Sequence, residues 1–370
     1  MKNKSICWVT PIAYIDTDIY IIPYLVNKYT LYWYIIIPYN GKLDYENQIN
    51  ELKNKYNNLF ISIISFKNRN RSIKLLIENY VFLSSIKNKF DLYYCPGGFP
   101  YFSLLLYYIL GTKRVIMPIH NVKTPKGGSN YYVTKWYTQF CVNHFKHFHT
   151  FSESQYKLLC SITNGKNIMY APFALKDYGF ATNKRVNPII TFTNFGNIRK
   201  YKRIDVLIRA AQYAYEETGK TFKILIAGDC KNWDEYNQII KYPFLFDVRI
   251  GRIDNDDIPN IFEESDYFVA PYQDIAQSGS MIVAINYEKP IIASKLEAFE
   301  EYIEDGKTGY FINTADVDEL KSKLVFLINN HSRVYPLLIK NVKQLKIDKF
   351  NIENIVEKYC AFFDSIIVNG

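Results

Sequence analysis

Residues 189–208 read IITFTNFGNIRKYKRIDVLI. The segment opens with a short apolar run, Ile189–Thr193, which has the length and β-branched content of a buried parallel strand. A glycine-containing loop follows, and Arg203–Thr218 then has the apolar spacing of an amphipathic helix. A buried strand that leads through a glycine loop into a helix is the repeating unit of α/β proteins with parallel sheets.

The same alternation extends along most of the chain. Before residue 183, we expect strands at Ser5–Thr10, Tyr32–Pro38, Phe60–Ser65, Leu92–Cys95 and Val115–Pro118, and helices at Ile19–Tyr29, Tyr45–Tyr56, Ile73–Ile86, Tyr101–Leu110 and Asn130–Phe145. After residue 188, we expect strands at Ile189–Thr193, Phe222–Gly228, Phe246–Ile250, Tyr267–Pro271, Pro290–Ser294 and Thr308–Phe311, and helices at Arg203–Thr218, Asp234–Lys241, Ile258–Glu264, Ser278–Tyr287 and Val317–Asn329. This order predicts an α/β fold of two Rossmann-like doubly wound domains that face each other across a cleft.

Length and charge also indicate two domains. The chain has 370 residues, about twice the size of an ordinary domain. We expect one domain over residues 1–183, a second over 188–348, and a helix over 350–366 that packs back on the first. Residues 1–180 hold 21 Lys and Arg against 9 Asp and Glu, within a net charge of +9 for the whole chain. A basic first half suits an anionic partner or a membrane surface, although a solvated lysine-rich surface has the same composition.

The cysteines and apolar runs indicate a cytoplasmic protein. The six cysteines show neither CxxC nor zinc-type spacing, as is usual for buried thiols of a reducing compartment. The longest apolar runs, Leu31–Pro38 and Tyr101–Leu110, are shorter than the ~20 residues of a spanning helix. His144, His147 and His149 straddle an expected helix end and strand, so we expect no metal site there.

Two loops that follow strands in the second half are suited to a diphosphate. The first holds Gly196, where a ligand can approach the backbone, and the cations Arg199 and Lys202, which suit phosphate oxygens. The second opens a helix with Ser278 and Gly279, which cap the helix and leave its first amides uncovered. Each loop alone is also compatible with an ordinary solvated helix start. Together, at strand ends of one sheet, they predict a site that holds one diphosphate from two sides.

Other nucleotide-binding classes lack support. Neither GxGxxG nor a Walker P-loop occurs, which argues against dinucleotide oxidoreductases and P-loop NTPases.

The loops also resemble a known family. Gly196–Ile208, GNIRKYKRIDVLI, resembles the G-x-I-R-x-Y-K-G-x-D-x-L-I motif of family-4 retaining glycosyltransferases (glycosyl transferases group 1, GT-B fold), with Arg203 replacing a glycine. Gln277–Gly279 resembles the family's Q-S-G helix start, and Lys289–Ser294 resembles its G-K-P-V-I-A-[ST] strand. Glu301 and Glu304–Gly309 match the E-V-V-E-D-G-x-T-G turn that follows. Order and spacing agree over residues 189–312.

The resemblance implies roles for the matching residues. Arg199 and Lys202 would neutralise the departing donor diphosphate next to Gly196, and the amides of Ser278 and Gly279 would hydrogen-bond it. His120, which follows a strand, would contact the sugar at the reaction centre. Further nucleotide or sugar contacts would come from Asn121, Asp274, Gln277 and Glu301. Members of this family need no metal. In their reaction the acceptor attacks the front face of the sugar, while the leaving phosphate helps to take the acceptor's proton. We therefore expect no cofactor, with a UDP- or GDP-linked sugar as substrate.

The chain departs from the family at its E-x7-E motif. Val283 stands where the family has the carboxylate that holds the ribose, and Ile275 stands where it has the first glutamate. Asp274 and Gln277 are the candidates to replace them. Glu288 replaces the glycine of the G-K-P strand motif.

These observations predict a retaining, metal-independent glycosyltransferase that acts on a glycan or lipid-linked acceptor in surface polysaccharide synthesis. One alternative is a degenerate GT-B protein with a glycan-binding or scaffolding role, which the lost carboxylates favour. A nucleotide-sugar epimerase is another, and nucleic acid is not an expected partner. Lys135, Trp136 and Lys146 within Asn130–His147 suit a peripheral membrane surface, although the same aromatic residues could pack on the sheet.

Overall fold

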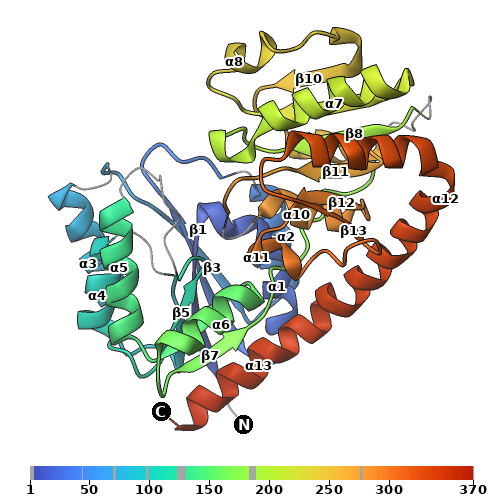
Figure 1. The fold of residues 1–370 in the computed structure, drawn as a ribbon. Coiled ribbons are helices and arrows are strands. Elements are labelled where there is room, and N and C mark those ends of the chain that lie inside the picture. The colour runs from blue at the N-terminus through green and yellow to red at the C-terminus, as the bar shows by residue number, and fades with distance from the viewer. Residues whose placement is uncertain are drawn as a thin grey trace. The chain divides into compact units, whose positions relative to one another are not determined.

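The computed structural model describes residues 4–43, 45–69, 72–96, 100–122, 131–182, 189–275 and 278–369. The chain forms two compact units, of which unit 1 comprises Met1–Ala174 and Phe350–Gly370, and unit 2 comprises Leu175–Lys349 (Figure 1). Each unit is built around one parallel sheet flanked by helices. The predicted α/β class with two Rossmann-like doubly wound parts is confirmed.

The units divide at Ala174, ahead of the domain limit expected at residue 183. Hydrogen bonds hold the segment after Ala174 on unit 2. Asn286 Nδ2 donates to the carbonyl of Lys176 at 3.2 Å, and the Tyr287 hydroxyl donates to the carbonyl of Gly179 at 3.0 Å. The expected linker, residues 183–188, lies outside the described residues.

Unit 1 contains a seven-stranded sheet in the order β3-β2-β1-β4-β5-β6-β7, and each neighbouring pair is parallel. Side chains alternate across the central strand β1 (Ser5–Pro11), because Ile6 and Trp8 pack on one face of the sheet while Cys7 and Val9 pack on the other. Both faces are therefore buried, as in most parallel sheets. The other strands are β2 (Thr30–Ile37), β3 (Leu59–Ser65), β4 (Leu92–Tyr94), β5 (Val115–Ile119), β6 (His147–Thr150) and β7 (Asn167–Tyr170).

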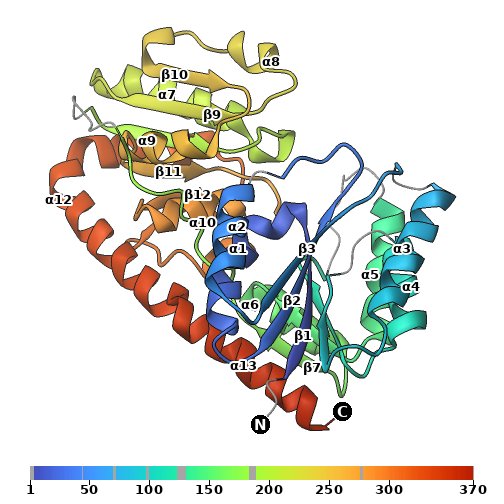
Figure 2. The same ribbon diagram turned by 180° about the vertical axis from the view of Figure 1, so that it is seen from behind.

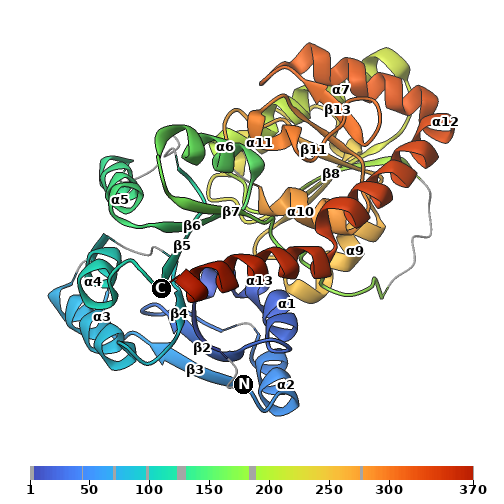
Figure 3. The same ribbon diagram turned by 90° about the horizontal axis from the view of Figure 1, so that it is seen from below.

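Helices cover both faces of the unit 1 sheet. Helices α1 (Ile15–Leu25), α2 (Glu46–Lys55) and α13 (Ile352–Asn369) contribute to the core that contains Trp8 (Figure 3). Helices α3 (Ile73–Ile86), α4 (Pro100–Leu110) and α5 (Tyr131–His144) lie side by side on the opposite face (Figures 1 and 2). The short η1 (Ile12–Tyr14) and α6 (Glu153–Ile162) complete the unit.

The C-terminal helix α13 is part of the core of unit 1. Its residues Ile355, Tyr359 and Phe363 are buried there, and Phe363 lies 6.3 Å from Trp8 between ring centroids. The Tyr29 hydroxyl donates to Asp364 at 2.9 Å. The apolar face of α13 therefore packs into the core of unit 1. In the sequence, all residues of unit 2 lie between α13 and the rest of unit 1.

A buried polar network ties α1 to the sheet. Asp18 Oδ2 accepts hydrogen bonds from Trp8 Nε1 at 2.9 Å and from Thr10 Oγ1 at 2.6 Å. Trp33 Nε1 in turn donates to Thr10 Oγ1 at 2.7 Å. Burial raises the pKa of Asp18 to about 7, and the hydrogen bonds from Thr10 and Trp8 oppose that rise. The carboxyl is thus a titrating group inside the fold.

Unit 2 contains a six-stranded sheet in the order β10-β9-β8-β11-β12-β13, and its neighbouring pairs are also parallel. Its apolar core gathers residues of β8, β9, α7 and α12, including Phe192, Ile224, Leu207 and Leu324. The strands are β8 (Thr191–Phe195), β9 (Lys223–Gly228), β10 (Phe246–Ile250), β11 (Tyr267–Ala270), β12 (Ile291–Ser294) and β13 (Gly309–Ile312). The helices are η2 (Lys200–Lys202), α7 (Ile204–Thr218), α8 (Asp234–Asn237), η3 (Pro243–Leu245), η4 (Asn255–Asp257), α9 (Ile258–Glu263), α10 (Gly279–Asn286), α11 (Glu297–Glu300) and α12 (Val317–Phe350).

Helix α12 is longer than the sequence predicts. The expected helix ends at Asn329, but α12 continues through Pro336 to Phe350. Buried Leu338 and Val342 lie beyond the expected end, so packing supports the added turns. A proline inside a helix removes one backbone hydrogen bond, and here it does not end the helix.

Both sheets have a point where the direction of strand succession reverses. In unit 1 this switch lies between β1 and β4, and in unit 2 it lies between β8 and β11. Loops that leave the carboxyl ends of two such strands go to opposite faces and leave a crevice, where ligands of open α/β sheets bind. Each unit has a cavity at its switch point.

Candidate active site

The cavity of unit 2 has a volume of about 450 Å³ and lies at the β8/β11 switch point. Phe195 and Gly196 reach it from the end of β8, and Ile275 reaches it from the loop after β11. Lys176, Lys202 and residues 278–280 at the start of α10 also line it. No acidic residue occurs among its described lining residues. The cavity thus concentrates positive charge and backbone amides.

Gly196 is required by the geometry of the loop that follows β8. Its φ is +96°, a conformation that residues with a side chain rarely adopt. A Cβ at this position would lie 2.5 Å from Oγ of Ser280 and 3.3 Å from Nζ of Lys202. The Gly196 amide donates to the carbonyl of Ala227 at 2.9 Å, which fixes the loop to β9. Glycine therefore allows the loop, the lysine and the start of α10 to meet.

Lys202 places a cation inside this cavity. Its side chain is 5% exposed, and its Nζ donates to the carbonyl of Phe195 at 3.4 Å. Nζ also lies 5.4 Å from the centre of the Tyr272 ring, within the range of a cation–π contact. Burial, with a further contribution from Arg199, lowers the pKa of Lys202 to about 8. A buried ammonium with a carbonyl and a ring as its partners is disposed to bind an anion.

Arg199 is placed differently from Lys202. It precedes the short helix η2 in an extended conformation, whereas Lys202 is the last residue of that helix. Its guanidinium donates to the carbonyl of Ile198 at 2.9 Å and lies 3.7 Å from a carboxyl oxygen of Asp229. It is half-exposed and outside the cavity lining, although its charge acts on the pKa of Lys202. Of the two cations that the sequence offers to a diphosphate, the structure therefore brings Lys202 to the cavity lining and leaves Arg199 outside it.

The start of α10 forms the other wall. Ser278 is buried, and its side chain accepts a hydrogen bond from the amide of Met281 at 3.4 Å, as an N-cap does. A Cβ on Gly279 would lie 3.8 Å from Nζ of Lys176. The partial positive charge of the helix start and the Lys176 ammonium thus lie together. Sequence reasoning did not single out Lys176, because it lies in no motif and follows the last strand of unit 1.

Comparison with known proteins agrees with this geometry. Residues 189–330 match the family described as Glycosyl transferases group 1. Over these residues the chain is similar to a group 1 glycosyltransferase domain. It is 26% identical over 177 residues to the poly(ribitol-phosphate) alpha-N-acetylglucosaminyltransferase of Staphylococcus aureus (strain COL), a match that covers 44% of this chain and 33% of that protein. The matched part spans 33% to 48% of the length of the curated relatives.

Solved structures share the fold of the whole chain. A glycosyltransferase from Rickettsia africae ESF-5 is 15% identical, with a TM-score of 0.74 and 100% of both chains covered. Anabaena HepE in complex with UDP and glucose is 12% identical, with a TM-score of 0.72 and coverage of 98% of this chain and 100% of that one. The GT-B fold expected from the motifs is thereby confirmed.

Two replacements in the region that matches the family model occur at positions with left-handed backbone. Arg203 has a φ of +51° and Glu288 has a φ of +58°. The family motif places glycine at both positions, and glycine adopts this conformation without the penalty of about 1 kcal/mol that a side chain brings. Ion pairs accompany the replacements, because Arg203 pairs with Asp205 at 2.8 Å and Glu288 pairs with Lys343 at 3.3 Å. The backbone of the motif is kept although its glycines are lost.

The cavity wall is apolar at the two positions that correspond to the E-x7-E motif. Val283 and Ile275, which replace the two glutamates of the E-x7-E motif, both line the cavity, and Val283 is 2% exposed. Asp274 is exposed and outside the lining, so the structure does not bring it to the place of a lost carboxylate. Gln277 lies outside the described residues. Glu301 is half-buried, and its carbonyl accepts a hydrogen bond from Lys349 outside the cavity lining.

The remaining candidates lie in unit 1. The ring of His120 is stacked between those of Tyr14 and Phe151, with ring centroids 4.3 Å and 4.4 Å away and interplanar angles of 8° and 9°. His120 follows β5, as predicted, and the two stacked rings fix the plane of its imidazole. Asn121 is half-buried beside it.

The other histidines of unit 1 have local partners. The His144 ring is in hydrogen-bond contact with the carbonyl of Phe140 at 2.8 Å, and the His147 ring with that of Lys113 at 3.0 Å. His149 lies between the Tyr94 hydroxyl at 2.6 Å and the carbonyl of Ala171 at 2.9 Å. Burial lowers the pKa of His149 to about 3. Over the described ranges, no group of three or more His, Cys, Asp or Glu residues is arranged to hold a metal ion.

None of the helices in the described part of the chain combines the length and the apolar character needed to cross a lipid bilayer.

Proposed function

We propose that the protein is a retaining glycosyltransferase that moves a sugar from a nucleotide-diphosphate donor to a glycan or lipid-linked acceptor. The observation that carries the proposal is the Lys202 ammonium, buried beside Gly196 and the start of α10 in a cavity whose described lining holds no carboxylate. A diphosphate would supply the missing negative charge. The family match over residues 189–330 supports the same chemistry.

The chain's own groups would act on the leaving diphosphate. As the bond between the sugar and the phosphate breaks, negative charge grows on the phosphate oxygens, and preorganised donors that face this charge accelerate the reaction. Lys202 and Lys176 would supply ammonium groups, and the first amides of α10 would supply hydrogen bonds. Because no described lining residue is acidic, the phosphate oxygens are the base that the cavity offers to the acceptor's proton. This arrangement supports front-face attack, which retains the configuration of the sugar.

The same groups support catalysis without a metal. Divalent cations such as Mg²⁺ are held by carboxylates and other oxygen ligands. Two lysines occupy the cavity instead, and they would neutralise the diphosphate directly. UDP-linked hexoses are the first donors to test, because HepE was solved with UDP and glucose.

A surface of unit 1 supports action at a membrane. Large apolar side chains are exposed on the neighbouring helices α3, α4 and α5, where Tyr132 is 83% exposed and Trp136 is 56% exposed. Lys74 and Lys135 are exposed on the same helices. Aromatic and basic residues on one face suit the interface of an anionic leaflet. We propose that this α3–α5 surface holds the enzyme at the cytoplasmic face of the membrane, where lipid-linked acceptors of surface polysaccharide synthesis occur.

The test is a screen of UDP-, GDP-, ADP- and CMP-sugars for thermal stabilisation and donor hydrolysis, with and without EDTA. We expect one diphosphate-linked donor to stabilise the protein and to be turned over regardless of EDTA, while CMP-sugars, which lack a diphosphate, have no effect. Lys202→Ala should abolish both responses. Lys200→Ala removes an exposed lysine two residues away and should retain them. Donor binding that needs a metal, or that survives in Lys202→Ala, would overturn the proposal.

The apolar ribose wall favours one alternative. With Val283 and Ile275 in place of carboxylates, the domain could bind glycan or donor without transferring sugar. Stabilisation by a donor without turnover, in the presence of a range of acceptors, would support that non-catalytic role.

A further inference from the structure

The sheet of unit 1 ends on one side at β3 (Leu59–Ser65), its outermost strand. Figure 3 shows β3 at the margin of this sheet, with α2 and α3 to either side. An edge strand offers its backbone amides and carbonyls to another chain, so native proteins usually shield it by charges, prolines or short length. The sequence of β3, LFISIIS, is seven residues long and contains neither a charged residue nor a proline.

The other edge strands of the two sheets carry such protection. Strands β7 and β13 are only four residues long. Strand β10 holds Asp247 and Arg249, which form an ion pair at 2.7 Å. On β3, by contrast, Phe60 and Ile63 are each 48% exposed. Among the described strands, β3 is therefore the sheet edge that is open to pairing.

The register between β2 and β3 fixes which backbone groups of β3 point away from the sheet. The two strands pair without interruption, and just beyond them the Phe66 amide donates to the carbonyl of Ile37 at 2.9 Å. Alternate residues of a parallel strand bond to the neighbouring strand, so the even-numbered residues of β3 bond to β2. The outward amides and carbonyls belong to Leu59, Ile61, Ile63 and Ser65. The described residues give those of Ile61 and Ile63 no partner.

We infer that two copies of this chain pair through β3, antiparallel and about a two-fold axis at Ser62, and so join two unit 1 sheets into one. With the axis at Ser62, the central residue of the strand, the copies overlap over all of β3. Ile61 then lies opposite Ile63 of the second copy. Both residues have outward backbone groups, so each such pair exchanges two hydrogen bonds. A shift of the register by one residue would oppose outward groups to groups already bonded to β2.

The side chains of β3 match those of its own copy. Phe60 stacks on Tyr32 of one face, with ring centroids 4.8 Å apart, and Ile61 packs against the core on the other face. After pairing, Phe60 meets Ile64 of the second copy on the first face, and Ile61 meets Ile63 on the second. Aromatic and β-branched cross-strand pairs of this kind stabilise antiparallel strands. The pairing also covers the exposed parts of Phe60 and Ile63, which favours a second copy over an unrelated strand.

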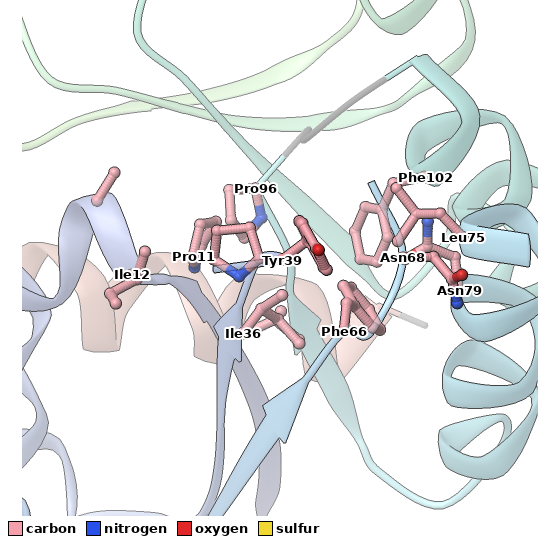
Figure 4. Close-up of a pocket in the computed structure, with 13 residues that line it drawn as sticks. Pro11, Ile12, Ile36, Tyr39, Phe66, Asn68, Leu75, Asn79, Pro96 and Phe102 are labelled. Atoms are coloured by element: carbon pink, nitrogen blue, oxygen red, sulfur yellow. The ribbon is translucent and has the colours of Figure 1, made fainter. Parts of the chain in front are cut away.

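The arrangement keeps the ligand-binding ends of the two sheets apart. Phe66, which follows β3, lines a cavity of about 190 Å³ together with Ile36 and Tyr39, at the carboxyl ends of the strands (Figure 4). Antiparallel pairing places the two carboxyl edges on opposite sides of the joined sheet, so each cavity lies at its own end. A two-fold axis perpendicular to the sheet also keeps both α3–α5 surfaces on one face. The dimer would therefore present the proposed membrane contact twice on the same side.

Sedimentation of the full chain over a range of concentrations tests the pairing. We expect a monomer–dimer equilibrium with a Kd on the order of micromolar, as suits a small interface. Ile63→Lys places a charge at an exposed position of the seam and should weaken the dimer at least about tenfold. Ile162→Lys, the same change at an exposed position of α6, should have no effect. A wild type that stays monomeric at about 100 μM, or a dimer that Ile63→Lys leaves unchanged, would overturn the inference.

Cysteine cross-linking tests the register, in a background where the exposed Cys160 is replaced by serine. Ser62 would face its own copy in a non-hydrogen-bonded pair, whose Cα atoms lie about 4.5 Å apart, a separation that a disulfide spans. Ser62→Cys should therefore form a covalent dimer when dissolved oxygen oxidises the two thiols, detected on a non-reducing gel. Ser65→Cys, an exposed position of the same strand, should stay monomeric, because its copy lies at the far end of the pairing. Equal cross-linking at both positions, or none at residue 62, would contradict pairing through β3.

The inference goes beyond the proposed function and can be judged without it. Neither sedimentation nor cross-linking uses a sugar donor or a membrane. UDP binding is measured on the same samples, and we expect Ile63→Lys to retain it, because β3 contributes no residue to the cavity of unit 2. A dimer that does not bind UDP would contradict the proposed function and leave the pairing through β3 standing.

Discussion

Gly196 and Ser280 approach so closely that a Cβ on the glycine would lie 2.5 Å from the serine hydroxyl oxygen. The first residue follows β8 and the second belongs to the first turn of α10. The two walls of the candidate anion site are therefore in contact, and neither can shift alone. We expect this contact to set the spacing between Lys202 and the α10 amides.

Gly196→Ala tests that contact. It adds a methyl group at a φ of +96° and against Ser280, so we expect it to destabilise the protein by about 2–4 kcal/mol and to weaken UDP binding at least tenfold. Chemical denaturation and calorimetry with UDP measure the two effects. Gly219→Ala is the matched control, because its φ is +62° but no atom lies within 4 Å of the added Cβ. Ser280→Ala combined with Gly196→Ala should recover part of the loss, and a double variant no better than Gly196→Ala alone would disprove the role of this contact.

Donor affinity should depend on the protonation of Lys202. Burial lowers its pKa to about 8 in the free protein, and a bound diphosphate would raise it again. Binding therefore takes up a proton near this pH, and UDP affinity should fall as the pH rises from 7 to 9.5. Calorimetry in buffers of different ionisation enthalpy would detect the proton. Lys202→Arg stays protonated and should show a flat profile, so the same decline in both proteins would rule out Lys202 as the titrating group.

Asp18 should make unit 1 more stable at low pH than at neutral pH. Its pKa is about 7 in the folded chain, above the usual carboxyl value of 3.8. Between these values the folded state keeps a proton that the unfolded chain has lost, so this contribution falls as the pH rises from about 4 through 7. Asp18→Asn cannot titrate. Its stability relative to the wild type should therefore improve between pH 4.5 and pH 8, by up to about 4 kcal/mol. Asp256→Asn, at an exposed position, should show no such change, and a constant difference for Asp18→Asn would refute the burial effect.

Phe363 tests the contribution of α13 to unit 1. Its ring is fully buried and lies within 6.3 Å of those of Trp8, Tyr94, Tyr29 and Tyr359. We expect Phe363→Ala to cost about 3–5 kcal/mol, because it removes a large ring from a packed core. Val368→Ala, on the exposed side of the same helix, should change stability by less than about 0.5 kcal/mol. Equal effects of the two variants in urea unfolding would mean that α13 is not packed as the structure shows.

The α3–α5 surface should bind anionic membranes. Replacing Trp136 and Val133, both exposed on α5, by serine should lower partitioning onto phosphatidylglycerol vesicles several-fold in a co-sedimentation assay. Leu337→Ser removes an exposed apolar side chain of unit 2 and should leave partitioning unchanged. Binding to neutral phosphatidylcholine vesicles should be weaker. If the α5 double variant sediments like the wild type, the membrane contact lies elsewhere or does not form.

Most strands of the two sheets could be predicted, because the apolar pattern that marks a strand lies within the strand's own residues. The predicted Ser5–Thr10 and Phe246–Ile250 agree with β1 and β10 to within a residue, since each is a short, mostly apolar run. The predictions missed β7, and for β6 they gave only a strand around His147 and His149 without bounds. The sequences of the two strands, NIMY and HFHT, contain polar residues paired by tertiary contacts. In β6, for example, His149 is buried because Tyr94 and Ala171 satisfy its ring nitrogens. Helix α1 begins at Ile15, ahead of the predicted Ile19, so the acidic Asp16 and Asp18 belong to its first turn.

The candidate site could be predicted only in part. Gly196, Lys202 and Ser278 belong to loops that the motifs mark, and the structure brings them to one cavity. Lys176 could not be found, because its place at the start of α10 depends on hydrogen bonds from Asn286 and Tyr287 to the segment around it. Such long-range contacts leave no periodic trace in a sequence. The positive φ of Arg203 and Glu288, by contrast, could be foreseen from the glycines that the family has there.

The place of α13 in unit 1 has a consequence for how the protein folds during its synthesis. All of unit 2 leaves the ribosome before the helix that carries Tyr359 and Phe363. Until α13 has been synthesised, the apolar side chains of β1 and α1 that pack on it stay exposed to solvent. All residues of the core of unit 2 have by then been synthesised. Unit 1 can therefore close its core only after all of unit 2 has been synthesised. Its uncovered sheet is the surface on which a nascent chain would need a chaperone.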